Sequence, residues 1–182
     1  MRAHAEEYGI HPDKIAAVGG SAGGQLAALL GTSGGLAELE GTGGNSGYSS
    51  DVNLVIVFFG MFDLAELHRY SLLEDNVSIV GVVEAYVGGT PEQSPLEYEL
   101  ASAISHVDEA DPPVLLIHGT SDELVPFGQS VRFKEVLEAA GVPVELFAIE
   151  GAKHGFGFGS AQRLYFRETV GRMALFIYKY LG

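Results

Sequence analysis

Cysteine is absent from the 182-residue chain. Without a thiol the chain can form no disulfide, no thiolate zinc site and no iron–sulfur cluster, and it has no cysteine nucleophile. Basic residues are also scarce, because 10 Lys and Arg stand against 24 Asp and Glu and give a net charge of −14. An acidic surface repels phosphate groups and anionic lipids, so this charge argues against a nucleic-acid or membrane partner.

Long hydrophobic runs are missing as well. The most apolar stretch, residues 52–62, is far shorter than the roughly 20 residues that a helix needs to cross a bilayer. The first ten residues contain two glutamates and no apolar segment of the kind found in a secretion signal. The sequence therefore predicts a cytoplasmic location.

Four short apolar segments alternate with helical patterns along the chain: residues 15–19, 54–59, 114–118 and 144–149. Nearly continuous apolar runs are typical of strands that are covered on both faces. Helical patterns precede Gly141 and fill the C-terminus, where a stripe of apolar residues is expected to face a core: Phe166, Val170, Met173, Ile177 and Tyr180. This alternation predicts an α/β fold with three layers, α/β/α, and a mostly parallel sheet.

The chain length indicates one domain over residues 1–182. Residues 64–110 mix helical signals with glycine and proline turns, such as the prolines that follow Asp111. We expect this segment to be a cap-like excursion over a pocket within that single domain.

A serine stands between the first predicted strand and the helix that follows it. Residues 19–23, GGSAG, fit the pattern G-x-S-x-G, in which glycines let the chain turn so tightly that the serine is exposed. The dinucleotide and phosphate-loop motifs do not fit, because they require a further glycine or a lysine that this segment lacks. The pattern favours Ser21 as a nucleophile, with the backbone N–H of Ala22 at a positive helix N-terminus as an oxyanion donor.

A serine nucleophile needs a base, and one histidine has a suitable position. His154 follows the last predicted strand in a glycine-rich loop, at the carboxyl end where sites of α/β proteins lie. The other five are expected to be structural: His4 and His11 beside an N-terminal helix, His68 and His106 in surface-like segments, and His118 at the end of a strand.

The orienting acid is expected on a loop that can reach His154. Asp122 follows the third strand and fits best, whereas its neighbour Glu123 is expected to be solvated. Asp63 is a second candidate, for which the sequence favours a helix N-cap. Ser21, Asp122 and His154 then follow the order serine, acid, histidine that α/β-hydrolases use.

Three segments carry a family resemblance: GGSAGG followed by QLAALLGTSGG, PPVLLIHGTSDELVP, and GAKHGFG. They resemble the α/β-hydrolase superfamily and, within it, the carboxylesterases grouped with acetyl-xylan and feruloyl esterases and with hormone-sensitive-lipase-like enzymes. The resemblance spans nearly the whole chain. It implies that Ser21 is the nucleophile, His154 the general base and Asp122 the orienting acid. Acyl transfer by these three groups needs no metal or cofactor.

The sequence departs from that family in the segment before the G-x-S-x-G turn. Such hydrolases carry several strands there, and a loop of the His-Gly-Gly-Gly type that supplies one oxyanion donor, and the sequence shows neither. We expect a truncated α/β-hydrolase fold with a slow rate, since one oxyanion donor is typically worth about 2.7–4 kcal/mol. The first strand is expected to form an exposed sheet edge, so we also expect a homodimer or higher oligomer.

The function that this sequence favours is hydrolysis of short-chain acyl or small aryl esters through an acyl-enzyme intermediate. Two alternatives stay open. One is a weak or inactive hydrolase remnant that acts as a scaffold. The other is a peptidase similar to prolyl oligopeptidases, although that family generally has an aromatic residue on each side of the serine, where Gly20 and Ala22 stand.

Overall fold

The computed structural model of the chain describes residues 1–156 and 165–182. The strands lie within one residue of the ends that the sequence predicts for them. In chain order the elements are η1 (Arg2–His4), α1 (Ala5–Tyr8), β1 (Ala16–Gly20), α2 (Ala22–Thr32), α3 (Ala37–Glu40), β2 (Leu54–Phe58), α4 (Leu64–Leu73), α5 (Val77–Val87), α6 (Pro95–Ala101), η2 (Ala103–His106), β3 (Val114–Gly119), α7 (Gly128–Ala139), β4 (Val144–Ile149) and α8 (Phe166–Leu181).

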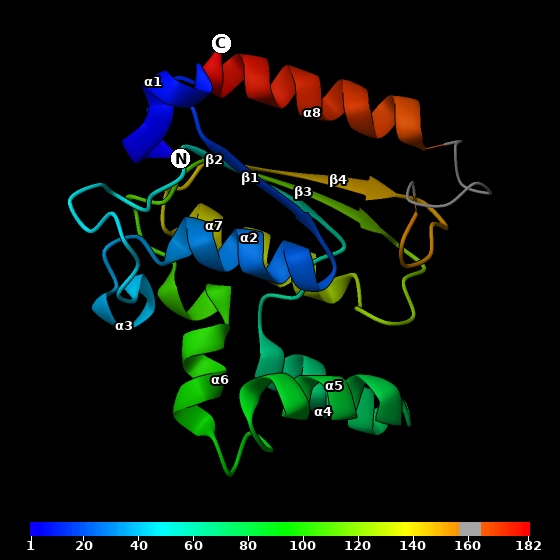
Figure 1. Cartoon of the computed structure of the whole chain (residues 1–182). Helices are drawn as coiled ribbons and strands as arrows, with labels where there is room; N and C mark the ends of the chain where they lie inside the picture. Colours follow the sequence, from blue (N-terminus) through cyan, green and yellow to red (C-terminus); the bar gives the residue numbers. More distant parts are fainter. Residues whose placement is uncertain (157–164) are drawn as a thin grey trace.

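The four strands form one parallel sheet in the order β1-β2-β3-β4. In this sheet Gly20 lies opposite Phe58, and Gly119 lies opposite Ile149. Parallel neighbours require crossover connections, and helices supply them here. All four strands therefore end at the same edge of the sheet, at the right of Figure 1.

Helices cover both faces of the sheet, with α2 and α7 on one side and α8 on the other (Figure 1). Between the sheet and the first pair lies an apolar cluster that includes Val57, Leu116 and Phe133. A second cluster under α8 includes Ile56 and Phe176. The alternating side chains of each strand thus enter two separate cores. This arrangement confirms the predicted three-layer α/β/α fold.

The central and outer strands differ in burial. Every residue of β2 and β3 is buried, as the sequence predicts for strands covered on both faces. For β1 and β4 that prediction is wrong, since most of their residues are partly or fully exposed. The side chain of Val18, for example, is 50% exposed. The helix α8 packs mainly on β2 and β3, and the exposure of Val18 shows that this face of β1 is incompletely covered.

The C-terminal helix α8 faces the sheet with a different stripe from the one expected. Phe176 is buried, with Met173 and Tyr180 partly buried beside it. Val170 and Ile177 are 44% and 37% exposed, so the prediction for these two is wrong. The apolar residues of this helix cover more than one face, and periodicity alone does not show which face the sheet contacts. The side chain of Phe166, also in the expected stripe, is not described.

The helices α4, α5 and α6 lie below the main sheet in Figure 1 and have their own small core. Two buried glutamines form hydrogen bonds between the helices beside the sheet and the ends of this segment. The side-chain oxygen of Gln129, on α7, accepts hydrogen bonds from the backbone N–H groups of Phe62 and Asp63 at 2.8 and 3.0 Å. Gln25 of α2 donates its amide to the carbonyl of Ala101 at 2.7 Å. The segment 64–106 is therefore fixed close to the start of α2, which directly follows Ser21.

The strand β1 lies at an edge of the sheet, which agrees with the prediction that the chain self-associates. Among the described residues β1 pairs with β2 only, and a bare strand edge presents backbone groups to other chains. We expect a dimer or higher oligomer by light scattering at micromolar concentration. A charge on an edge strand opposes pairing, so Val18→Lys should shift the mass toward the monomer. A monodisperse monomer of the unchanged chain would contradict the prediction.

A carboxyl group before β3 should make the stability of the fold depend on pH. Burial raises the pKa of Asp111 to about 6, and the charge of Asp108 adds to this. Its contribution to stability is therefore present at pH 4 and lost as the pH rises through 6. We expect Asp111→Asn to be more stable than the parent by ~1 kcal/mol at pH 8, allowing for solvent screening of this half-buried group. In urea unfolding the difference should vanish near pH 4, and a difference that is independent of pH would contradict the assignment.

Candidate active site

Ser21 lies in the turn between β1 and α2 with an unusual backbone conformation. Its φ and ψ are 55° and −122°, a region that side chains other than glycine rarely occupy. Two hydrogen bonds hold this geometry: the N–H of Ser21 donates to the carbonyl of Phe58 at 2.9 Å, and its own carbonyl accepts from Gln25 at 3.0 Å. Strain of this kind persists where the surroundings impose it, and it clusters at functional sites.

The glycines of this turn are not equivalent. A Cβ at Gly19 would collide with the carbonyl oxygen of Gly23, so the first glycine of the motif is required by close approach. A Cβ at Gly23 would meet nothing within 4 Å. The second close approach falls on Gly24, where a Cβ would lie 2.8 Å from the side chain of Val57 and 3.2 Å from the Cα of Gly60.

This difference gives a matched pair of variants. We expect Gly19→Ala to displace the turn and to lower the predicted ester hydrolysis by about 10²-fold, as a shift of about 1 Å in reacting groups does. Gly23→Ala should instead raise the free energy of unfolding by ~0.5–1 kcal/mol, because alanine is the better helix former. Hydrolysis of an aryl acetate and urea unfolding would measure both. Equal activity losses in the two variants would contradict this account of the turn.

The three residues that the sequence nominates lie in one hydrogen-bonded line. His154 Nε2 is 2.9 Å from Ser21 Oγ, and His154 Nδ1 is 2.8 Å from Asp122 Oδ2. The carboxylate accepts a hydrogen bond from Nδ1–H, so Nε2 carries a lone pair and accepts a hydrogen bond from the hydroxyl of Ser21. The side chain of Asp122 is fully buried and that of His154 is 17% exposed. Such a line can move a proton from a serine to an imidazole.

Asp122 is held as a carboxylate by several donors. Burial acts to raise its pKa, but hydrogen bonds from His118, His154 and the backbone of Val125 outweigh burial and hold the pKa well below its usual range. The other carboxylate oxygen, Oδ1, accepts from the backbone N–H groups of Leu124 and Val125 at 3.0 and 2.9 Å. The acid is therefore ionised and fixed in orientation at neutral pH.

The loops after β3 and β4 are joined, which sets the distance between acid and base. The N–H of Ser121 donates to the carbonyl of Ala152 at 3.1 Å, and the N–H of Gly151 donates to the hydroxyl of Thr120 at 2.9 Å. A Cβ at Gly119 would collide with the carbonyl oxygen of Ala152, so glycine is required where the two loops approach most closely.

Aromatic rings support the base from the side of β2. Phe59 directly follows that strand, has a φ of 37° and is buried. Its ring meets the imidazole of His154 edge-on at 4.7 Å and the ring of Phe156 at 5.0 Å. Such packing restricts the tilt of the imidazole. Gly157, the last residue of the GAKHGFG segment, lies outside the described residues.

The structure gives one histidine a closer connection to the site than the sequence predicts. His118 is fully buried, and its Nε2 lies 3.2 Å from Asp122 Oδ2. The sequence predicts for His118 only a structural role at the end of a strand, although its position four residues before Asp122 is a signal for contact with that acid. For His68 the predicted surface position is wrong, because the residue is buried and its Nε2 lies 2.8 Å from Glu84.

The alternative acids have other roles. Asp63 caps α4, since its side chain accepts from the N–H of Glu66 at 2.8 Å, which confirms the predicted N-cap. It also forms an ion pair with Arg132 at 2.9 Å. Glu123 is exposed and pairs with Lys153 at 2.9 Å. Neither carboxylate has a hydrogen bond to His154.

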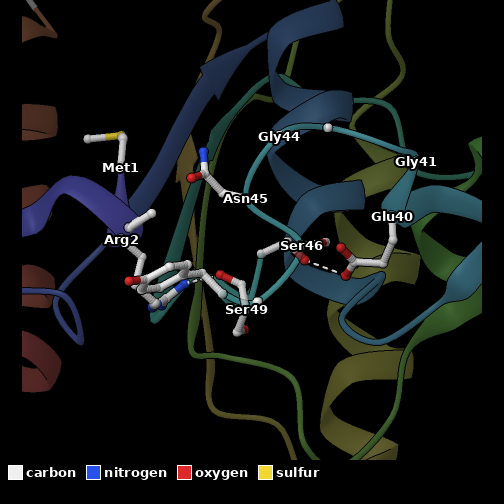
Figure 2. A pocket seen from close by; sticks show the side chains of 13 residues that line it. Met1, Arg2, Glu40, Gly41, Gly44, Asn45, Ser46 and Ser49 are labelled. Atoms are coloured by element: carbon white, nitrogen blue, oxygen red, sulfur yellow. Dashed lines mark hydrogen bonds between the residues drawn. The ribbon is translucent and has the colours of Figure 1, made fainter.

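Two hollows near the surface differ in their relation to Ser21. An open hollow of about 610 Å³ lies between Arg2 and Glu40, with the glycine- and serine-rich loop 41–50 around it (Figure 2). This loop precedes β2 and lies at the amino edge of the sheet, opposite the edge that carries Ser21. A smaller apolar pocket of about 150 Å³ is lined by Ala22, the residue that directly follows Ser21.

Residues 1–156 and 165–182 contain neither a cluster of metal-binding side chains nor a candidate membrane-spanning helix. No group of three or more His, Cys, Asp or Glu side chains within these ranges could hold a metal ion. No helix in the same part of the chain is long and apolar enough to span a membrane.

The known proteins that this chain resembles include several esterases. The family model BD-FAE matches residues 1–137. Esterase LipQ of Mycobacterium tuberculosis is 29% identical over 165 residues, which cover 90% of this chain and 38% of LipQ. An acetylxylan esterase of Xylanibacter ruminicola is 25% identical over 167 residues, covering 88% of this chain and 29% of its own length.

A solved esterase of the planctomycete Thermogutta terrifontis has a similar fold. It is 32% identical, with a TM-score of 0.77, and the match covers 98% of this chain and 59% of that structure. The same esterase has been solved with propionate and with butyrate bound. The chain thus spans less than two thirds of the length of these relatives. The matches confirm the resemblance to carboxylesterases of the α/β-hydrolase fold.

Proposed function

The chain belongs to the BD-FAE family, and from this premise we propose that it is a serine carboxylesterase acting on short-chain acyl or small aryl esters. The observation that carries the proposal is the line from Ser21 through His154 to Asp122, with contacts of 2.9 and 2.8 Å. A serine hydroxyl hydrogen-bonded to a histidine base, which an acid orients in turn, is sufficient for acyl transfer.

The reaction proceeds in two halves. Ser21 Oγ attacks the ester carbonyl carbon while His154 Nε2 takes the hydroxyl proton, and the negative charge that develops on the carbonyl oxygen faces the N–H of Ala22. The tetrahedral intermediate collapses, and His154 returns the proton to the departing alcohol. Water then attacks the acyl enzyme with the same base, which releases the acid and restores Ser21. Asp122 stabilises the imidazolium in both halves.

The N–H of Ala22 lies in the first turn of α2, where backbone N–H groups have no partner within the helix. A hydrogen bond from such a donor to the developing oxyanion is typically worth about 2.7–4 kcal/mol, so this N–H supports the attack of Ser21.

Two observations support short acyl groups. The esterase from Thermogutta terrifontis binds propionate and butyrate, and the relative from Xylanibacter ruminicola is an acetylxylan esterase. The apolar pocket beside Ala22 is small, at about 150 Å³.

The proposal is tested by pairing substrates with covalent labelling. We expect hydrolysis of p-nitrophenyl acetate and butyrate, no release of p-nitroaniline from a proline anilide, and a phosphonate adduct that peptide mass spectrometry assigns to Ser21. Preference for the anilide would favour a peptidase. An unlabelled Ser21 and no hydrolysis of any ester would favour a folded scaffold.

A further inference from the structure

The apolar pocket of about 150 Å³ beside Ala22 is lined by residues from two parts of the chain. Ala22 and Leu26 of α2 form one side, and Leu64 of α4 with Val83 and Tyr86 of α5 forms the other. Nearly all of its lining is apolar, so it favours a hydrocarbon group over a polar one. Val83 closes the pocket at its buried end, being 3% exposed, while Tyr86 is 54% exposed at its rim.

The position of the pocket relative to the base decides which part of an ester enters it. The base returns its proton to the alcohol oxygen, so the alcohol must leave beside His154, on the loop after β4. Neither His154 nor Asp122 lines the pocket, whereas Ala22 does. A carbonyl oxygen at the N–H of Ala22 therefore places the acyl carbon chain toward α5 and the alcohol toward His154.

We propose that this pocket binds the acyl chain and that α5 sets the length it accepts. At about 30 Å³ for a water-sized group, the pocket holds on the order of five non-hydrogen atoms. Acetyl to butyryl chains fit within that volume, and chains of eight carbons exceed it. The inference rests on the proposed esterase function and adds to it a straight, apolar acyl group of at most about five carbons.

Variants on α5 test this inference in both directions. We expect Val83→Phe to lower kcat/KM for p-nitrophenyl butyrate by about tenfold or more while the acetate rate changes little. Tyr86→Ala should raise the rate for the octanoate relative to the butyrate by about tenfold. Val77→Phe is the matched control, because Val77 lies on the same helix, is 74% exposed and does not line the pocket.

The outcomes separate this inference from the proposed function. If Val83→Phe lowers the acetate and butyrate rates equally and Tyr86→Ala leaves the chain-length profile unchanged, the acyl assignment is overturned. If either variant responds to the size of the alcohol instead, the pocket binds the leaving group. If Val83→Phe does not fold, Tyr86→Ala decides alone. No hydrolysis of any ester by the unchanged chain would overturn the esterase function itself.

A different observation, the environment of Asp122, carries a second inference. His118 Nε2 lies 3.2 Å from Asp122 Oδ2 and 3.0 Å from the carbonyl oxygen of Val125. Both neighbours are acceptors, so this nitrogen carries the proton. On the other side of the ring, Nδ1 lies 2.7 Å from the hydroxyl of Ser130, which can donate to it. Both histidine nitrogens are satisfied, and both residues are buried.

We infer that His118, fixed by Ser130, is a positioning residue for the acid. Asp122 Oδ2 accepts from His118 and His154 at once, so the carboxylate cannot turn away from the base. The same sharing leaves less of its charge for the imidazolium of His154. Removal of the His118 donor should therefore loosen the carboxylate and also strengthen its attraction for a proton on His154.

Other charged groups near Asp122 must be distinguished from His118. Glu123 and Lys153 pair with each other at the surface. An open groove that reaches Asp122 is lined by Tyr70 of α4 and by Glu74, the residue that follows this helix. From α7 the neighbouring group is the neutral hydroxyl of Ser130. Glu74→Gln is the matched control for this set, since it removes a charge from the groove without touching the buried pair.

The variants His118→Leu and His118→Gln test the inference, because a glutamine amide can still donate toward Asp122. We expect His118→Leu to lower kcat about tenfold and to move the acid limb of the kcat/KM profile up by about half a pH unit. His118→Gln should recover most of both changes, and Ser130→Ala should show smaller changes of the same sign. Proton NMR of the His154 ring gives its titration midpoint without any substrate, so this readout does not depend on the esterase function.

A purely structural role predicts a different pattern. His118→Leu would then lower the unfolding midpoint and leave the acid limb and the His154 titration where the unchanged protein has them. That result overturns the inference, and so does a His118→Gln variant that behaves like His118→Leu.

Discussion

Replacement of Ser21 by alanine is expected to lower kcat/KM for p-nitrophenyl acetate by at least about 10³-fold. The hydroxyl is the atom that becomes acylated, and His154 has no other hydroxyl within hydrogen-bonding distance among the contacts of the described residues. Ser21→Gly should be equally inactive but more stable. Its φ of 55° and ψ of −122° suit glycine, and relief of such strain is worth about 1–3 kcal/mol.

These two variants are measured beside Ser78→Ala, since Ser78 is exposed on α5 and has no part in the proposed reaction. Circular dichroism establishes that all three fold, and urea unfolding compares their stability. Equal residual hydrolysis by Ser21→Ala and the unchanged chain would rule out the acyl-enzyme mechanism. A loss of stability in Ser21→Gly relative to Ser21→Ala would show that the turn is not strained.

Replacement of Asp122 by asparagine is expected to reduce kcat on the order of 10³–10⁴-fold while the fold is retained. An amide cannot stabilise the imidazolium of His154, and its NH₂ group favours the wrong tautomer of that ring. The variant should also be less stable at pH 7 by ~2 kcal/mol, the usual worth of hydrogen bonds to a buried charge.

The pH dependence of this stability follows from the lowered pKa of Asp122. A carboxyl group with a lower pKa in the folded state stabilises the fold above its ordinary pKa, and the contribution is lost as the pH falls below about 4. The stability gap between the parent and Asp122→Asn should therefore narrow in acid. Glu123→Gln, which changes the exposed neighbour, should leave both activity and stability nearly unchanged. A large effect at Glu123 with none at Asp122 would reverse the assignment of the acid.

The strands and the proposed triad could be predicted because their signals are local. Buried strands appear as apolar runs, and G-x-S-x-G appears in five consecutive residues. Asp122 and His154 each follow such a run, and parallel strands bring their ends to one edge of a sheet. The contacts of 2.9 and 2.8 Å with His154 follow from that topology.

Other features depended on packing that the sequence does not display. The link from His118 to Ser130 joins β3 to α7, and neither residue type indicates which partner it finds. The requirement for glycine at Gly24 arises from Val57 and Gly60, more than 30 residues away. The exposed face of β1 and the true inner face of α8 likewise depend on which elements pack against each other. Periodicity shows which residues of an element are apolar, but not which of them contact a neighbouring element.

Each of the four strands ends in one part of the site: Ser21 after β1, Phe59 after β2, Asp122 after β3 and His154 after β4. The nucleophile and the base are 133 residues apart along the chain. Contacts of such long range form late when a chain refolds from denaturant, after helices and neighbouring segments. Recovery of catalysis should therefore lag behind the recovery of the helical circular dichroism signal. The return of activity would then report when the last long-range contacts of the sheet form.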